Sequence, residues 1–209
     1  MKAVRVEKQG GPEVLKLLDV APLEAPGPGQ AVVRVVAAGV NFVDVGQRRG
    51  TYPRQVPFTL GVEGAGVVES VGEGVRNVKP SDRVAFTGLP GAYSEAILAD
   101  ADRLIPLPNE FTFEEGAAFP LQGMTAHYLI HEFRRPVPGS FVLIHAAAGG
   151  MGGLLVQWAK HLGANVIGTI SMRQKHARRA RPALTTLLST QSRISWLKPS
   201  GSRTDGAQI

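Results

Sequence analysis

A chain of 209 residues, 44% of them hydrophobic, has room for one large or two small globular domains, and it contains no membrane-length apolar run and no signal peptide. Zero cysteines exclude disulfides and thiolate metal ligands, so we expect a protein of the reducing cytoplasm. Because no apolar run is long enough to span a membrane, we also expect no membrane partner. Residues 171–209 carry 8 of the 23 Lys and Arg but 1 of the 17 Asp and Glu, which leaves 15 cations and 16 anions elsewhere and argues against a folded nucleic-acid surface.

Short strands broken by glycine and proline fill the first 125 residues. The pattern predicts strands over residues 2–7, 14–20, 30–38, 64–71, 82–86 and 93–98. Short strands at this spacing are typical of a small β-barrel. The glycine-rich segment 61–66 enters one of these strands at a point where larger side chains would crowd their neighbours.

A polar cluster lies inside this region, between residues 41 and 52. Asn41, Asp44 and Arg48 are spaced at i, i+3 and i+7, so on a helix they share one face. Asp44 could then pair with Arg48, while Asn41 offers its amide to a carbonyl or a nicotinamide. Tyr52 could donate a phenolic hydrogen bond to a developing enolate oxygen. The structural alternative is that Asn41 caps a helix that carries one surface ion pair.

The hydrophobic period becomes helical over residues 113–129. Glu114 and Glu115 suit the first turn of a helix, because the helix dipole favours negative charge there. We expect the connection between two domains in this region, with residues 121–130 leading into the second domain.

The segment 139–160 carries the most informative chemical pattern. Residues 141–144 predict a buried parallel strand, residues 146–152 a turn of small residues, and the residues after them an amphipathic helix. Glycines would let the backbone approach a pyrophosphate, which free N–H groups and the helix dipole stabilise. Ala147 stands where a strict dinucleotide-binding pattern has its first glycine, so a glycine turn before an ordinary packed helix is the alternative.

A second apolar run, residues 165–170, follows the expected helix end at Gly163 and completes a β-α-β unit. NAD-specific sites usually place an acidic residue after this strand, where it binds the ribose 2′-hydroxyl. This chain instead has Ser171, Arg173 and Lys175, a hydroxyl and two cations that suit a 2′-phosphate. The sequence therefore favours NADPH over NADH, and solvated charges at the start of a helix are the alternative.

Several motifs follow one another in the order of a known family. They are Gln9-Gly10-Gly11-Pro12-Glu13-Val14-Leu15, Asn41-Phe42-Val43-Asp44 with Arg48, Gly50 and Tyr52, Gly61-Val62-Glu63-Gly64-Ala65-Gly66, Gln122-Gly123-Met124-Thr125-Ala126-His127, and the turn at 146–152. Through them, residues 1–175 closely resemble the quinone oxidoreductase or zeta-crystallin branch of the medium-chain dehydrogenase/reductase family. The resemblance implies a mixed α/β protein, in which a GroES-like β-barrel precedes a Rossmann doubly wound domain, and NADPH between them passes hydride to a quinone or another α,β-unsaturated carbonyl.

The resemblance also assigns site residues by position. It places on the substrate side Asn41, Asp44 and Tyr52, and at the nicotinamide end Gln122 and Thr125. It gives the pyrophosphate to Ala147, Gly149, Gly150, Met151 and Gly152, and the 2′-phosphate to Ser171 and Lys175. No strong general acid is visible, so water or Tyr52 would deliver the proton. Full-length family members commonly form homo-oligomers through the nucleotide domain.

Zinc-dependent relatives bind their metal through a cysteine, a histidine beside the Gly-x-Glu segment, and a further cysteine or acid. Here Val62 stands in the histidine position, and the chain has no cysteine. His127 and His131 lie at i, i+4 beside Glu132, without an evident third ligand. We therefore expect no metal site.

The resemblance ends near Arg181, which divides the chain into three parts. Residues 1–125 are the GroES-like substrate domain, residues 126–181 an incomplete Rossmann NADPH-binding domain, and residues 182–209 a poorly ordered tail without a helix or strand period. Codons can be chosen for this tail whose one-nucleotide shift reads GADHVIINPEQDFVAEAKRLTDGRGAD, which looks like the family's normal continuation. We therefore expect a C-terminally truncated chain with a frameshifted tail.

Truncation would uncover apolar side chains of the nucleotide half, at about 1.5–3 kcal/mol for each large one. The side chains concerned are Leu143, Ile144, Leu154, Leu155, Trp158, Val166 and Ile167. We accordingly expect weak NADPH binding and little turnover. The alternatives are a non-enzymatic truncated isoform that acts through its barrel, a crystallin-like structural protein, and an RNA-binding protein, although the basic surplus lies in the tail.

Overall fold

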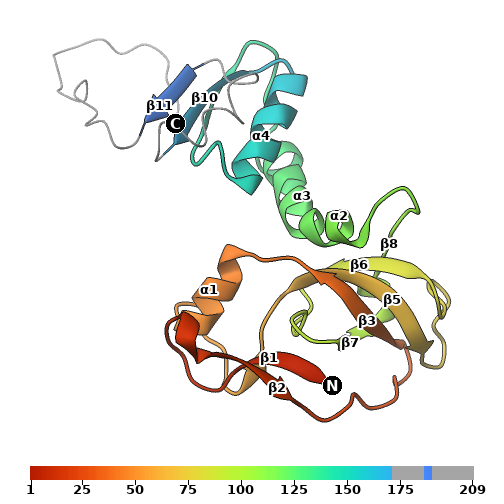
Figure 1. The fold of residues 1–209 in the computed structure, drawn as a ribbon. Coiled ribbons are helices and arrows are strands. Elements are labelled where there is room, and N and C mark those ends of the chain that lie inside the picture. The colour runs from red at the N-terminus through yellow and green to blue at the C-terminus, as the bar shows by residue number, and fades with distance from the viewer. Residues whose placement is uncertain (171–185, 190–209) are drawn as a thin grey trace. The chain divides into compact units, whose positions relative to one another are not determined.

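The computed structural model describes residues 1–170 and 186–189 of the chain (Figure 1). These residues form two compact units, the first covering Met1–Met124 and the second beginning at Thr125. The division falls inside helix α3 (Pro120–His127), in the region where the sequence predicts a connection. The three-part division expected from the sequence stays a prediction.

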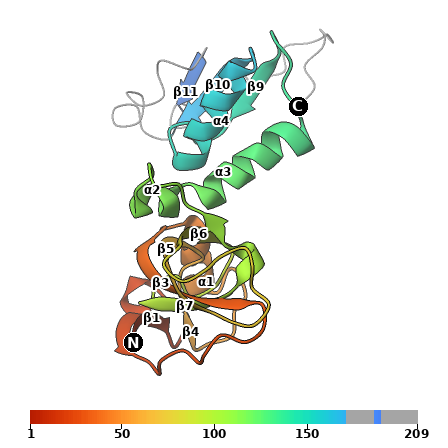
Figure 2. The same cartoon turned by 90° about the vertical axis from the view of Figure 1, so that its right-hand side faces the viewer.

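The first unit is built on two antiparallel sheets (Figures 1 and 2). The smaller has the order β2-β1-β4 and consists of β1 (Lys2–Val6), β2 (Leu15–Asp19) and β4 (Phe58–Thr59). The larger has the order β7-β3-β5-β6-β8 and consists of β3 (Gln30–Ala38), β5 (Glu63–Val71), β6 (Arg83–Thr87), β7 (Ala96–Asp100) and β8 (Ile105–Pro106). An isolated bridge between Ala3 and Ser94 links the smaller sheet to the segment before β7.

The strands of this unit enclose an apolar core, because their alternating side chains point to opposite faces of the sheet. Val33, Val68, Val84 and Phe86 are completely or almost completely buried in it. Gly66 lies where β5 pairs with β3, and an added Cβ would meet the carbonyl oxygen of Arg34. The crowding predicted for the glycine-rich segment is therefore real.

Four short helices complete the first unit before α3: η1 (Pro12–Val14), α1 (Phe42–Arg49), η2 (Ala101–Arg103) and α2 (Phe113–Ala118). Helix α2 begins with a capping box, in which Glu115 N–H donates to the hydroxyl of Thr112 at 3.1 Å and Thr112 N–H donates to Glu115 Oε2 at 2.8 Å. Its buried Ala117 packs against Ala65 of β5 and Ala85 of β6. The helix with an acidic first turn that the sequence predicts is present.

The second unit contains a parallel sheet of order β11-β10-β9. It consists of β9 (Phe141–Ile144), β10 (Asn165–Ile170) and β11 (Thr186–Ser189), and α4 (Gly150–His161) connects β9 to β10. This is the β-α-β unit that the sequence predicts. The third strand lies in the tail, where the sequence pattern predicts no strand.

Helix α4 covers one face of this sheet, and β9 is only half buried. Ile144 and Val166 are buried against Val156 and Ala159 of the helix, so two side chains expected to be uncovered are not. Leu143 is 55% exposed and Phe141 71% exposed. The prediction of a buried β9 is therefore wrong for these two side chains, since they alternate with the residues that α4 covers, whereas the exposure expected for Leu143 is found.

Helix α3 continues into η3 (Tyr128–Phe133), a turn of π-helix that packs against α4. His127 and His131 lie one turn apart, with ring centroids separated by 4.7 Å. Both rings meet Trp158 of α4 edge-on, with centroids 5.6 Å and 5.1 Å away. Within the described residues, no helix has the length and apolar character that a membrane span requires.

Candidate active site

The polar cluster of the first unit begins at the N-terminus of helix α1. Asn41 is the N-cap residue, with the extended backbone angles that precede a helix. Its N–H donates to Asp44 Oδ2 at 2.9 Å, and Asp44 N–H donates to the Asn41 carbonyl at 3.1 Å. The capping role that the structural alternative gives to Asn41 is thus present, and Asn41 is buried.

Asp44 is held from a second side by Tyr93, which precedes β7. The Tyr93 hydroxyl donates to Asp44 Oδ2 at 2.8 Å, while Asp44 is 3% exposed. Arg48 is also buried, but the ion pairs among residues 1–170 are Lys2–Asp19 and Arg34–Glu69. The predicted pairing of Asp44 with Arg48 is therefore wrong, because Asp44 turns its Oδ2 to the helix start and to Tyr93.

Two side chains near Asp44 have shifted pKa values. Burial raises the pKa of Tyr93, and the hydrogen bond and charge of Asp44, with the charge of Glu63, raise this pKa further. Burial lowers the pKa of Arg54, although the charge of Asp44 opposes that change. Tyr93 is consequently kept as a neutral hydrogen-bond donor to Asp44.

Glu63, the first residue of β5, is the second buried carboxylate and is 1% exposed. Its Oε2 accepts from Asn41 Nδ2 at 2.8 Å, and its Oε1 accepts from the N–H of Leu121 at 2.6 Å. Leu121 lies in the first turn of α3, where backbone N–H groups have no acceptor within the helix. One carboxylate thus connects the start of α1 to the start of α3.

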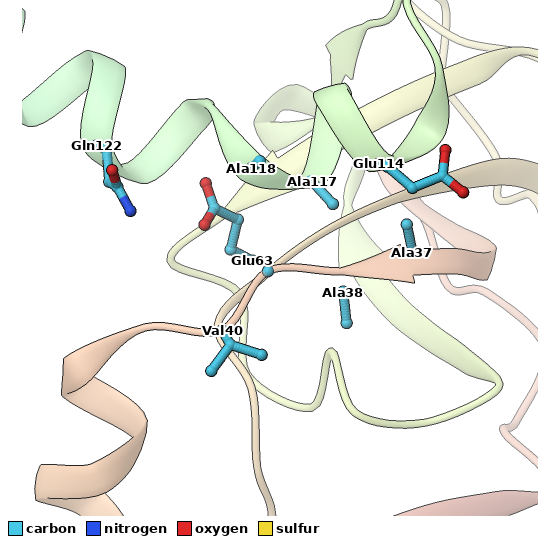
Figure 3. A pocket seen from close by; sticks show the side chains of 9 residues that line it. Ala37, Ala38, Val40, Glu63, Glu114, Ala117, Ala118 and Gln122 are labelled. Atoms are coloured by element: carbon cyan, nitrogen blue, oxygen red, sulfur yellow. The ribbon is translucent and has the colours of Figure 1, made fainter. Parts of the chain in front are cut away.

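Glu63 also lines a cavity of about 230 Å³ within the first unit. The other walls come from the end of β3 and from α2 and α3, and the lining residues are Ala37, Ala38, Gly39, Val40, Glu114, Ala117, Ala118 and Gln122. Figure 3 shows the Glu63 carboxylate between the β3 end and Gln122, whereas the Glu114 carboxylate points away from it. The cavity is therefore small, with the Glu63 carboxylate and the Gln122 side chain among alanine and valine side chains.

The remaining residues assigned by the resemblance are placed separately. Tyr52 is 52% exposed, and its ring lies against Gly46 of α1, where an added Cβ would collide with it. Gln122 lines the cavity of the first unit. Thr125 is exposed and is the first residue of the second unit. The hydrogen-bonded cluster therefore contains Asn41 and Asp44 but not Tyr52.

The glycine turn of the second unit runs from β9 into α4. Ala147 is fully buried and its N–H donates to the Thr169 carbonyl at 3.0 Å, so this N–H is not left for a phosphate. Gly149 is the N-cap, and Gly153 N–H makes the first helical hydrogen bond to the Gly149 carbonyl at 2.8 Å. The N–H groups of residues 150–152 therefore lack acceptors within the helix, which is the arrangement that binds a phosphate.

Gly152 allows this turn to pack tightly. An added Cβ would meet the Ala146 carbonyl oxygen and would lie 2.7 Å from Ala147 Cα. Only a glycine fits between helix and turn here, which is one of the roles of glycines in a dinucleotide-binding turn. Ser171 and Lys175, predicted to bind the 2′-phosphate, lie outside the described residues.

Comparison with known proteins identifies this arrangement. Residues 27–109 match the family model described as the alcohol dehydrogenase GroES-like domain. The chain is 46% identical over 182 residues to the quinone oxidoreductase of Pseudomonas aeruginosa. The aligned segment covers 86% of this chain and 55% of that protein. The chain is a homologue of the quinone oxidoreductases. It spans about half the length of the curated relatives it matches.

Two further relatives bear on the chemistry. The chain is 45% identical over 181 residues to a 2-haloacrylate reductase from Burkholderia sp, covering 83% of this chain and 54% of that one. The crystal structure of the Escherichia coli quinone oxidoreductase complexed with NADPH is 37% identical, with a TM-score of 0.87, and covers 92% of this chain and 60% of that chain. The predicted resemblance and the predicted fold class, a GroES-like domain with a partial Rossmann sheet, are confirmed.

The structure also shows which residues of the cluster the sequence patterns missed. Glu63 and Tyr93 belong to the hydrogen-bonded cluster, although the sequence presents Glu63 only within the glycine-rich segment 61–66 and Tyr93 only as the start of a strand. His145 Nδ1 lies 3.1 Å from the Thr169 hydroxyl and joins the carboxyl ends of β9 and β10. A carboxylate alone among glycine, alanine and valine, as at 61–68, was the available signal for Glu63. Within the described residues, no three potential metal-ligand side chains are grouped around a common point.

Proposed function

We propose that this chain carries the substrate side and the pyrophosphate side of a zinc-independent reductase, which uses NADPH to reduce a quinone or an α,β-unsaturated carbonyl. The observation that carries the proposal is the start of α4, where a glycine turn packs tightly and presents three backbone N–H groups. A relative with the same fold is an NADPH complex, which supports this choice of nucleotide.

The N–H groups of Gly150, Met151 and Gly152 would hold the pyrophosphate, since the positive end of the α4 dipole adds to their attraction. Gly149 would shape the turn, and Ala147 would do so from its buried position. Thr125 would contact the nicotinamide end, and Ser171 with Lys175 would bind the 2′-phosphate. These assignments explain a preference for NADPH over NADH by the charge of the 2′-phosphate.

On the substrate side, Asn41 and Gln122 would orient the reacting groups, and Asp44 would act through the helix start that it holds together with Tyr93. NADPH, when bound, supplies the hydride. The cavity at Glu63 is small, and its alanine and valine side chains would help to exclude water from a neutral ring or enone. Water or the half-exposed phenol of Tyr52 would deliver the proton to the substrate oxygen.

The proposal covers a reaction in the cytoplasm with a small molecule, and it does not include a membrane or a nucleic acid. Association into homo-oligomers is proposed for the full-length relatives and is not extended to this chain.

The test is a titration of the purified chain with NADPH and, separately, with NADH, followed by nucleotide fluorescence and by thermal unfolding. Saturable binding that prefers NADPH and raises the melting temperature is expected, and turnover with 1,4-benzoquinone would be measured next. Absence of binding to both nucleotides would overturn the proposal and favour a non-enzymatic protein.

A further inference from the structure

Glu63 is a buried charge that no cation neutralises within the described residues. It is 1% exposed, and the ion pairs of residues 1–170 do not include it. A buried carboxylate without a counter-ion is costly unless strong hydrogen bonds compensate it. The two N–H donors at 2.6 Å and 2.8 Å are short enough to be charge-assisted hydrogen bonds.

The two donors come from different walls of the cavity. Asn41 follows Val40 at the end of the β3 segment, and Leu121 precedes Gln122 in α3. Each carboxylate oxygen takes one donor, so the two walls are fixed relative to the same rigid group. The start of the α3 dipole further favours a negative charge at this point.

The same contact determines how the Asn41 amide is oriented. An ionised carboxylate can only accept hydrogen bonds, so the Asn41 atom that faces Glu63 must be Nδ2. The carbonyl oxygen Oδ1 is then directed away from Glu63 and faces the Asp44 N–H, as one half of the capping box of α1. A neutral partner that could both donate and accept would permit either orientation of the amide.

We infer that Glu63 is a positioning residue: it fixes the Asn41 amide with Oδ1 at the Asp44 N–H of the α1 start, and it holds the α3 start so that Gln122 stays in the cavity wall. This inference rests on the proposed function, because it deepens the role of the same substrate-side residues. Glu63 does not touch the reacting atoms and acts through Asn41 and α3.

The test compares Glu63→Gln with Glu114→Gln in the full chain. Both variants remove one carboxylate from the lining of one cavity, but Glu114 is exposed and its carboxylate points away from Glu63. The glutamine at position 63 has one acceptor oxygen, which can still serve Leu121, while its NH₂ group would face the NH₂ group of Asn41. The Asn41 side-chain amide must then flip or lose its hydrogen bond to the side chain at position 63.

The first readout needs no ligand and consists of the Asn41 side-chain NH₂ resonances and the exchange rate of the Leu121 amide in ¹⁵N-labelled protein. In the wild type, we expect one shifted, slowly exchanging Asn41 proton and a protected Leu121 N–H. Glu63→Gln should move the Asn41 signals and keep Leu121 protected, Glu63→Ala should lose both, and Glu114→Gln should change neither. Asn41 signals unchanged in Glu63→Gln would overturn the inference.

The second readout is kinetic, with NADPH and 1,4-benzoquinone. We expect Glu63→Gln to lower kcat about 100-fold, the scale of a misplaced catalytic geometry, while the dissociation constant for NADPH changes less than threefold. A purely structural role would instead lower melting temperature and NADPH affinity together. If the wild type binds no NADPH, the proposed function fails, and the resonances alone decide whether Glu63 positions Asn41.

Discussion

Single residues decide how closely the backbone elements of both units approach one another. In the second unit, Gly152 permits α4 to begin directly against the turn at Ala146 and Ala147, whereas the neighbouring Gly153 has open space around its Cα. In the first unit, Tyr93 holds the start of α1 by its hydrogen bond to Asp44. These two residues give the sharpest tests at this scale.

Gly152→Ala should destabilise the second unit by about 1–3 kcal/mol and abolish nucleotide binding, because backbone atoms that block the added methyl cannot rotate away. The matched control is Gly153→Ala in the same helix turn, where nothing lies within 4 Å of an added Cβ. That variant should be neutral or stabilise by up to about 1 kcal/mol. Thermal unfolding and NADPH titration of both variants check the prediction, and equal effects would contradict it.

Tyr93 should make the chain less stable at alkaline pH. Its pKa is raised above the ordinary value of 10.0 in the folded chain, so the unfolded chain releases this proton first. The contribution to stability is complete below about pH 10 and is lost as the pH rises toward the folded pKa. Urea unfolding at pH 8 and at increasingly alkaline pH measures this effect. As the pH rises, the free energy of unfolding should fall less for Tyr93→Phe than for the wild type.

Absorbance of the phenolate provides an independent check of the same prediction. The chain has three tyrosines, and we expect the last phenolate transition to disappear in Tyr93→Phe. Identical titration curves for the two proteins would refute the assignment.

At the scale of elements, the capping box fixes the start of α2, whose Ala117 packs against the alanines of β5 and β6. Thr112→Ala should cost about 1 kcal/mol of unfolding free energy, since Glu115 N–H loses its side-chain acceptor. Thr112→Ser keeps the hydroxyl and should lower the unfolding free energy by only about a few tenths of a kcal/mol. Urea denaturation of the three proteins measures both differences, and an equally large loss in the serine variant would show that packing and not capping matters.

Element positions followed from the sequence where one local rule dominates. The strand at residues 30–38 and the β9 strand have the predicted bounds, because apolar runs end at turn residues. The strand predicted at 93–98 begins only at Ala96, since Tyr93 N–H donates to the Leu60 carbonyl and its hydroxyl reaches Asp44. Both partners are distant in sequence, and no local period encodes them.

The candidate site was predictable only in part for the same reason. The spacing of Asn41 and Asp44 indicated a shared role, and the structure joins them by a capping hydrogen bond. The hydrogen bond from Tyr93 to Asp44 and the link from Asn41 to Glu63 depend on how segments distant in sequence pack around α1. A pattern of residue types contains no information about which of several acceptors a buried amide will face.

At the scale of the whole molecule, the two units have separate cores, and each also exposes large apolar side chains. The first unit exposes Val40 and Phe42, and the second exposes Phe141 and Leu143 of β9. Exposed large apolar side chains on one strand promote self-association. The exposed face of β9 should therefore contribute to self-association of the chain.

Phe141→Thr with Leu143→Thr should leave the unfolding free energy within about 0.5 kcal/mol of the wild-type value, because both side chains are already largely exposed. It should also reduce light scattering of concentrated solutions. Ile144→Ala on the opposite face of β9 should instead cost about 2–5 kcal/mol, since Ile144 is buried under α4. Calorimetry and light scattering distinguish the two faces, and similar destabilisation by both changes would disprove the exposure difference.

The ring cluster of His127, His131 and Trp158 gives the second unit an intrinsic optical reporter. The indole lies edge-on to two imidazoles of α3 and η3, so its emission depends on their packing against α4. The chain has one other tryptophan, Trp196, and a Trp196→Phe variant would isolate the Trp158 signal. Loosening of the η3 contact could then be timed in the unlabelled protein, independently of nucleotide and substrate.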